Sequence, residues 1–221
     1  MGTAPTLSRT NSKLNRKKSL ADGNTKTGRA IATYSRTPGA TCPGASAWCR
    51  ANCYAMRPYR QYKQTRAAWD RNATDRIPKL PKPKKNNELT FFRIHVSGDF
   101  DTPEYIMGWY YALKARPDVR AWAYTRSWAT SSGLEYSDLM PYLEKLRSVM
   151  QLFASTDPSI QIEPPSGWRI AAIDNDARYS GPKFPVCMEQ TKKQPDCASC
   201  RYCFIGTKGN INFIDHKELQ K

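Results

Sequence analysis

One apolar stretch decides the fold of this chain: Leu89-Thr90-Phe91-Phe92-Arg93-Ile94-His95-Val96. Its β-branched and aromatic content makes it the strongest strand signal in the sequence. A polar turn, Ser97-Gly98-Asp99-Phe100, follows at once, and residues 105–115 then have the apolar spacing of an amphipathic helix. Asp101-Thr102-Pro103-Glu104 supplies a cap and an initial proline to that helix. The stretch therefore opens a unit of strand, turn and helix.

Similar elements recur on both sides of this stretch. Further strands are predicted at residues 29–35, 119–124, 151–154 and 168–173, and further helices at 52–76 and 134–149. Strands that alternate with helices or crossing loops form parallel sheets of βαβ units. A closed eight-stranded barrel needs about 250 residues, and the chain has 221. We therefore predict an α/β fold with an open, partial β/α barrel.

Polar residues recur where the predicted strands end. Parallel β/α sheets bind ligands at the carboxyl ends of their strands, where loops and helix starts meet. The residues that we expect to bind a cofactor at this edge are Ser97, Gly98, Asp99, Arg126, Ser155 and Asp157. For His95, inside the main strand, we favour a hydrogen-bonded core position over a place in the site.

Three cysteines, Cys42, Cys49 and Cys53, lie within twelve residues in the loop after the first predicted strand. Pro43 and Gly44 follow the first of them and can bend the backbone around a guest. Three thiols this close together are typical of ligands for a soft metal centre. The alternative is that they are ordinary buried cysteines, or a disulfide with a spare thiol.

A second group of cysteines has the spacing Cys-x9-Cys-x2-Cys-x2-Cys. Its members are Cys187, Cys197, Cys200 and Cys203. Four thiolates can close either a tetrahedral zinc site or a cubane iron–sulfur cluster, and both remain open here. We expect a Cys-rich metal-binding extension over residues 187–221, following a barrel over residues 29–186.

The formal net charge of +16 and the sequence pI of about 9.7 should attract polyanions, nucleic acid above all. Four basic residues at every third position should form one helix face that contacts phosphate, or simply a solvated face; they are Arg57, Arg60, Lys63 and Arg66. Residues 1–28 are polar and basic and predict a flexible arm. Without an apolar signal region or membrane span, we expect a cytoplasmic protein with no membrane partner.

From about residue 29 onward the chain resembles the phage gene-product-88 family, which is little characterised. The residues that carry this resemblance are Thr41-Cys42-Pro43-Gly44-Ala45, Cys49, Cys53-Tyr54-Ala55, residues 93–100, residues 124–128 and the closing cysteine group. This resemblance implies a protein that acts in the cytoplasm of a bacterial host.

A cysteine triplet after the first strand, with Tyr54 beside the last cysteine, also resembles radical S-adenosylmethionine (SAM) enzymes. In those enzymes three thiolates hold a [4Fe-4S] cluster whose fourth iron is open for SAM. The resemblance implies this role for the triplet, a contact between Ser97-Gly98-Asp99 and the amino group of SAM, and an auxiliary cluster at the closing cysteines. The spacing here, Cys-x6-Cys-x3-Cys, is longer than the usual Cys-x3-Cys-x2-Cys.

Two functional hypotheses follow. The first is an iron–sulfur phage protein with one or two [4Fe-4S] clusters and a radical-SAM-like core, which cleaves SAM to modify a nucleic acid or a nucleotide. The second is a non-enzymatic protein in which iron–sulfur clusters or zinc stabilise a module that binds nucleic acid or a host protein.

Overall fold

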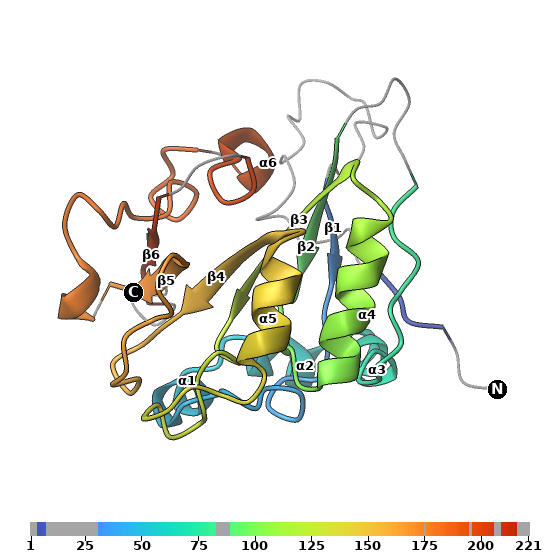
Figure 1. Cartoon of the computed structure of the whole chain (residues 1–221), viewed down its shortest axis with the longest axis horizontal. Coiled ribbons are helices and arrows are strands. Elements are labelled where there is room, and N and C mark those ends of the chain that lie inside the picture. The colour runs from blue at the N-terminus through green and yellow to red at the C-terminus, as the bar shows by residue number, and fades with distance from the viewer. Residues whose placement is uncertain are drawn as a thin grey trace.

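The computed structural model describes residues 4–7, 31–82, 89–174, 176–194, 196–205 and 209–215. They form a mixed α/β fold around one six-stranded sheet, in which every pair of neighbours is parallel (Figure 1). The strands β1 to β6 span Ile31–Tyr34, Thr90–Ile94, Val119–Thr125, Gln151–Ser155, Arg169–Ile173 and Ile211–Phe213. Their order in the sheet follows the chain, and β1 and β6 are the two open edges. The predicted parallel α/β fold is confirmed at this level, whereas a radical-SAM-like barrel is not shown.

The five strands predicted from the sequence are all present. The sixth, β6, was not predicted, because a strand of three residues is too short to show a periodicity. It pairs with β5, with Ala171 opposite Ile211. Residues 187–221 therefore contribute a strand to the same sheet.

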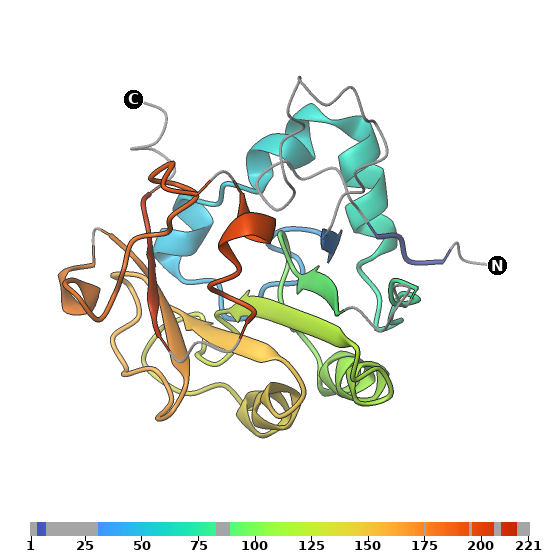
Figure 2. The same cartoon turned by 90° about the horizontal axis from the view of Figure 1, so that it is seen from above.

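Two helices, α4 (Pro103–Lys114) and α5 (Met140–Arg147), cover one face of the sheet (Figure 2). The predicted start of α4 is confirmed, because the Thr102 hydroxyl accepts a hydrogen bond of 3.1 Å from the Tyr105 amide and Pro103 begins the helix. The main core lies between α4 and the sheet. It forms around Trp109, which is fully buried. Its ring lies 5.6 Å from that of Tyr34 on β1 and 5.7 Å from that of Phe92 on β2.

The opposite face of the sheet is covered by the C-terminal segment. Phe91 and Trp122 point to this side, since they alternate along β2 and β3 with residues of the main core. Phe204 packs on both, with ring centroids 4.8 Å and 4.3 Å away. The short helix α6 (Cys197–Cys200) precedes Phe204 on this side, across the sheet from α4 and α5 (Figure 2).

The helix predicted over residues 52–76 is wrong as a single element. That segment forms α2 (Met56–Gln61) and α3 (Lys63–Arg71) instead, and the short helix α1 (Ala47–Ala51) precedes it. Tyr62 has extended backbone angles, φ −113° and ψ 106°, and separates α2 from α3. The four basic residues spaced every third position are all exposed, but they are shared between two helices. The helix predicted over 134–149 is shorter than expected and begins at Met140.

Two further expectations concern the ends of the chain and membranes. The basic arm predicted over residues 1–28 lies outside the described residues, apart from 4–7. In the part of the chain that the structure describes, no helix is long and apolar enough to cross a membrane.

Candidate functional site

The loop that carries the first three cysteines packs directly on the turns that end β2 and β3. Gly98 has φ +78°, and a Cβ there would lie 2.7 Å from Thr41 Oγ1 and from Arg36 Cβ. Gly44 approaches the turn after β3 so closely that its Cβ would lie 2.0 Å from the Arg126 carbonyl oxygen. Neither position has room for a side chain, so the two glycines fix how the cysteine loop sits on the sheet edge.

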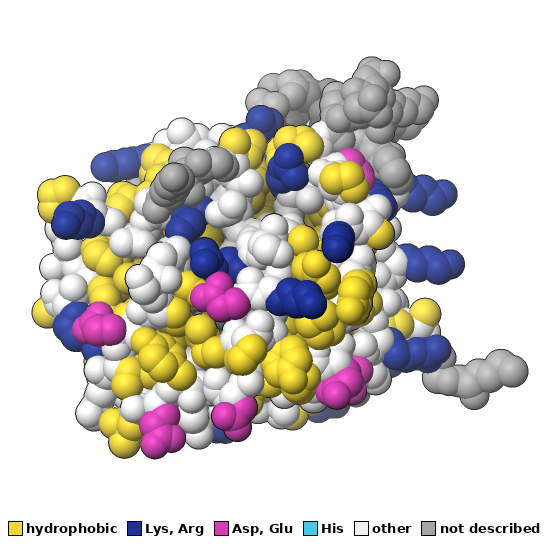
Figure 3. All heavy atoms as spheres, in the orientation of Figure 1, with side chains coloured by type: hydrophobic (Ala, Val, Ile, Leu, Met, Phe, Trp, Pro, Cys, Tyr) yellow, Lys and Arg dark blue, Asp and Glu magenta, His cyan; other side chains and the backbone are white. Residues whose placement is uncertain are grey.

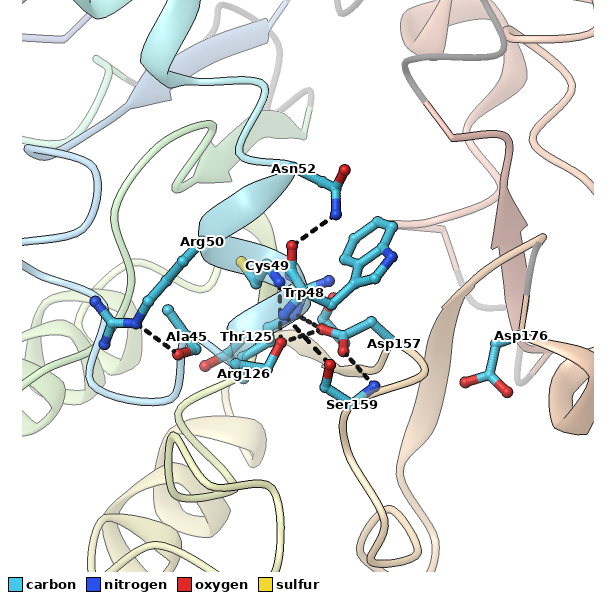
Figure 4. Close-up of polar contacts among 12 residues, drawn as sticks. Ala45, Trp48, Cys49, Arg50, Asn52, Thr125, Arg126, Asp157, Ser159 and Asp176 are labelled. Atoms are coloured by element: carbon cyan, nitrogen blue, oxygen red, sulfur yellow. Dashed lines mark hydrogen bonds and ion pairs between the residues drawn. The ribbon is translucent and has the colours of Figure 1, made fainter.

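A buried carboxylate at the end of β4 holds α1 in place. Ser46 accepts a hydrogen bond of 3.0 Å from the Cys49 amide and so caps α1, while its hydroxyl donates to Asp157 Oδ2 at 2.8 Å. The Arg126 Nε donates to the same oxygen at 2.9 Å, and the Ser159 amide donates to Oδ1 at 3.0 Å (Figure 4). Asp157 is fully buried, and these bonds tie Cys49 to the ends of β3 and β4.

Cys42, Cys49 and Cys53 line one cavity of about 230 Å³ at the carboxyl edge of the strands. Five of the residues expected to bind a cofactor line it as well: Ser97, Gly98, Asp99, Arg126 and Ser155. The sixth, Asp157, does not line the cavity; it accepts hydrogen bonds from Arg126 and Ser46 instead. The sequence thus anticipated which strand ends meet here.

Two thiols of this cavity, Cys42 and Cys49, are held in their neutral form. Burial first, and then the nearby Asp99 carboxylate, raise the pKa of Cys42 to about 12. Burial also raises the pKa of Cys49, while the Arg126 guanidinium acts in the opposite direction. Since thiolates are the form that binds metal, a metal centre here would have to displace protons.

The Asp99 carboxylate is hydrogen-bonded within the protein. Its Oδ1 accepts hydrogen bonds from the Phe100 amide at 2.8 Å and the Thr125 hydroxyl at 2.6 Å, and its Oδ2 accepts one from the Arg126 amide at 2.8 Å. Burial raises the pKa of this carboxyl, and the three hydrogen bonds oppose that rise. Asp99 therefore clasps the ends of β2 and β3 together and has little capacity left for a ligand.

The favoured interpretation of His95 as a core residue agrees with its surroundings. It is 3% exposed, and its Nε2 lies 2.8 Å from the Tyr105 hydroxyl on α4. Its φ of +59° takes it out of the strand alternation, so the ring turns toward Phe100 and Tyr105 even though the residue borders the cavity. Burial holds its pKa well below the usual value, so the imidazole is neutral at pH 7.

The second group of cysteines lines a neighbouring cavity of about 190 Å³ on the sheet face opposite α4 and α5; the four are Cys187, Cys197, Cys200 and Cys203. Asp196 caps α6 by accepting a hydrogen bond of 2.8 Å from the Ser199 amide. Burial raises the pKa of Cys203 to about 11. The two cavities share three wall residues, Arg93, Tyr124 and Phe213.

All seven cysteines are described, and all are free thiols. Among the described residues, no group of three or more His, Cys, Asp or Glu side chains is arranged to hold a metal ion. The disulfide alternative is therefore not seen in either group. The predicted metal-binding extension is not shown as a formed site.

The comparisons with known proteins place the chain in a family. A model of the family described as gene product 88 matches residues 5–206. The chain belongs to the gene product 88 family. It is 26% identical over 209 residues to the Gene 88 protein of Mycobacterium phage L5, an alignment that covers 81% of this chain and 84% of that protein. It is 27% identical over 201 residues to the Gene 88 protein of Mycobacterium phage D29, covering 77% of this chain and 80% of that one.

No solved structure matches this member of the gene product 88 family. The phage resemblance seen in the sequence is confirmed by the family match and by the two mycobacteriophage relatives. The more distant resemblance to radical SAM enzymes receives no support from the comparisons.

Two site residues were missed by sequence reasoning. Ser46 was assigned no role, because its neighbours in the sequence give no sign that it bonds to Asp157, which lies 111 positions away. Arg93 could have been found from the sequence, since it is a charged residue in the middle of the strongest strand signal of the chain. A cation in such a stretch indicates a wet or functional face of the sheet.

Proposed function

We propose that the protein binds a [4Fe-4S] cluster through Cys42, Cys49 and Cys53. The observation that carries this proposal is that these three cysteines, of the seven in the chain, line one cavity at the carboxyl edge of the sheet. Cubane clusters take thiolate ligands, one for each iron. Three cysteines leave one iron for a small ligand from outside the protein, and the cavity offers room for it.

A [4Fe-4S] cluster and a single zinc ion make different demands on three thiols. At a Zn–S distance of about 2.3 Å, tetrahedral ligands bring their sulfur atoms within about 4 Å of one another. No described group of side chains is arranged to hold one metal ion. In a cubane each thiolate binds a different iron, so the sulfur atoms stand further apart. The cavity of about 230 Å³ that the three cysteines line offers space for such a cluster.

The protein's own groups would assist by charge and by orientation. The Arg126 guanidinium lowers the pKa of the Cys49 thiol against the effect of burial, and Asp157 holds that guanidinium in place. It therefore favours the thiolate that a metal centre requires. The Ser46 cap fixes the backbone of α1, on which Cys49 lies.

The finer part of the proposal concerns SAM and the substrate. A cluster held by Cys42, Cys49 and Cys53 would pass one electron from an external reductant to SAM and so supply its reductive cleavage. The backbone of Ser97 and Gly98 borders the cavity and is the part of the turn that a ligand would meet, because the Asp99 carboxylate is already hydrogen-bonded within the protein. The net charge of +16 favours a nucleic acid or a nucleotide as the substrate that is modified.

Anaerobic purification followed by analysis of iron, sulfide and zinc tests the cluster. We expect a brown protein that contains about four iron atoms for each occupied site. A colourless protein with stoichiometric zinc would contradict the proposal. Reduction in the presence of SAM, with an assay for 5′-deoxyadenosine, then tests the chemistry separately. An iron-containing protein whose spectrum does not respond to SAM would retain the cluster and reject the SAM step.

A second candidate function, non-enzymatic nucleic-acid binding, is favoured by the basic surface beside the cavity. Arg57 and Arg60 on α2 and Lys63 and Arg66 on α3 are exposed, and no ion pair joins any of them to another described residue. Basic side chains are also spread over the face shown in Figure 3, where the acidic ones lie mainly in the lower half. A metal centre would then serve only to stabilise the fold.

A further inference from the structure

Arg93 lies where the two cysteine-lined cavities meet. It is on β2, opposite Thr33 of β1 and Trp122 of β3, and it borders both cavities together with Tyr124 and Phe213. Its guanidinium carbon lies 5.0 Å from the centre of the Tyr124 ring. A ligand in either cavity would therefore be within reach of the same cation.

The charge of Arg93 is not balanced within the described part of the protein. Its Nε is buried without a hydrogen-bond partner, and neither a hydrogen bond nor an ion pair joins the guanidinium to another described residue. The Tyr124 ring offers only its face to this cation.

The other arginines near the cavities are satisfied in a different way. Arg126 pairs with Asp157 at 2.9 Å. Arg169 donates to the carbonyl oxygens of Gly209 at 2.7 Å and Cys203 at 3.1 Å. A buried N–H donor without a hydrogen-bond partner, such as the Nε of Arg93, is costly, since its lost hydration is not replaced. Arg93 is the exception, and its position indicates that the partner comes from outside the chain.

We propose that Arg93 binds the oxyanion, a carboxylate or a phosphate, of a small ligand that lies across the junction of the two cavities. The planar guanidinium presents paired N–H donors that match either oxyanion. The aromatic rings of Tyr124 and Phe213 form the wall beside it, so the ligand carries a flat apolar body next to its charge. This inference does not rest on the proposed cluster, because none of its contacts involves a metal.

Isothermal titration of the purified protein with phenyl phosphate and with benzoate, in about 0.15 M salt to suppress non-specific attraction, tests the site. The two probes share an apolar ring and differ in the oxyanion, so their relative affinities identify the preferred group. We expect saturable binding of one probe at one site per chain. Arg93→Gln should weaken it at least about tenfold, and Arg93→Lys, which keeps the charge and loses the paired donors, should weaken it less.

Arg120→Gln is the matched control, because Arg120 is an exposed arginine on the neighbouring strand β3. Among the described residues its guanidinium donates only to the Pro117 carbonyl, at 3.1 Å. This variant should bind the probe as the wild type does. Iron is measured in every sample, so that loss of ligand and loss of metal are told apart. Weaker binding by Arg93→Gln at unchanged iron content supports the site. Absence of saturable binding in the wild type, unchanged binding in Arg93→Gln, or loss only in samples that have also lost iron would overturn it.

Discussion

The Arg126 guanidinium and the Asp157 carboxylate form an ion pair of 2.9 Å in which the carboxylate is completely buried. The same oxygen of Asp157 accepts the Ser46 hydroxyl, so one carboxylate joins the end of β3, the end of β4 and the cap of α1. This arrangement makes the position of Cys49 depend on a residue that contacts neither the thiol nor the cavity.

Asp157→Asn should destabilise the fold by about 3–5 kcal/mol, because it removes one partner of a buried pair and leaves the Arg126 charge uncompensated. Urea unfolding followed by tryptophan fluorescence gives the free energy of unfolding. Asp118→Asn is the control, since it breaks an ion pair of 2.6 Å with Arg116 that is partly exposed on both sides. It should cost no more than about 1 kcal/mol. Equal losses of unfolding free energy in the two variants would show that the buried network around Asp157 stabilises the fold no more than a partly exposed ion pair does.

Gly98→Ala should disturb the cysteine loop. The new Cβ would meet Thr41 and Arg36 at 2.7 Å, and alanine would also have to adopt a φ of +78°. We expect a loss of about 2–4 kcal/mol from backbone strain and overpacking together. Gly39→Ala separates the two contributions, because Gly39 has φ +79° and nothing within 4 Å of the added Cβ. It should lose only the strain, about 1–2 kcal/mol. If Gly39→Ala lost as much stability as Gly98→Ala, close packing around Gly98 would not explain the loss.

Substitution of single cysteines should divide the metal that we propose into two independent parts. Cys53→Ala should abolish the centre of the first cavity and leave the metal of the second group, while Cys200→Ala should do the reverse. The reason is that each cysteine borders one cavity only. Iron and zinc analysis, with the visible spectrum, measures both outcomes. Loss of all metal in either variant would indicate one shared centre and contradict two separate cysteine groups.

His95 should make the protein less stable in mild acid. Burial first, and then the positive charges of Arg36 and Arg93, hold its pKa well below the usual value near 6.5 in the folded protein. Below pH 6.5 the unfolded chain therefore binds a proton that the folded protein does not. The stability is complete above that pH and falls below it by up to about 1.4 kcal/mol per pH unit. His95→Asn, which suits the φ of +59°, should flatten the dependence between pH 5 and 6.5. If the stability of the variant still fell with pH at the same slope, the pH dependence would come from other groups.

Binding to single- or double-stranded nucleic acid should weaken steeply with salt if the basic helices α2 and α3 contact phosphate. Each lost phosphate contact lowers the slope of log affinity against log salt by about 0.7–0.9. The double variant Arg57→Gln with Arg60→Gln should therefore reduce the slope of log affinity against log salt by the amount that about two phosphate contacts contribute. The metal content should not change. The same double substitution on an exposed face elsewhere, Arg120→Gln with Lys114→Gln, serves as the control. A slope that stays unchanged in the α2 variant would rule out this surface.

The sequence predicted the parts of this protein that depend on local pattern and on the geometry of parallel sheets. Five strands and the start of α4 follow from β-branched runs and from the Thr102 cap. Because parallel strands end at one edge, the gathering of Ser97, Arg126 and Ser155 around the cysteine loop was also predictable.

The remainder depends on contacts between distant segments. Asp99 and Asp157 look alike in the sequence, each a carboxylate after a strand, yet one clasps two strands and the other stands behind the wall. Which role each takes is fixed by depth and by partners that arrive from other turns. The break at Tyr62 between α2 and α3 was equally hidden, because the charged residues around it keep a helical spacing through an extended residue.

The strand order has a consequence for how the protein is made. Every strand pairs with the one that precedes it in the chain, so the sheet can grow strand by strand in the order of synthesis. The cysteine loop emerges early, after β1, but its anchor at Asp157 is 111 positions further along than Ser46. Until β4 has joined the sheet, the three thiols of a nascent chain therefore lie on a loop without this anchor. Delivery of the proposed cofactor would have to wait until that interval of translation has passed, or the thiols would have to be shielded during it.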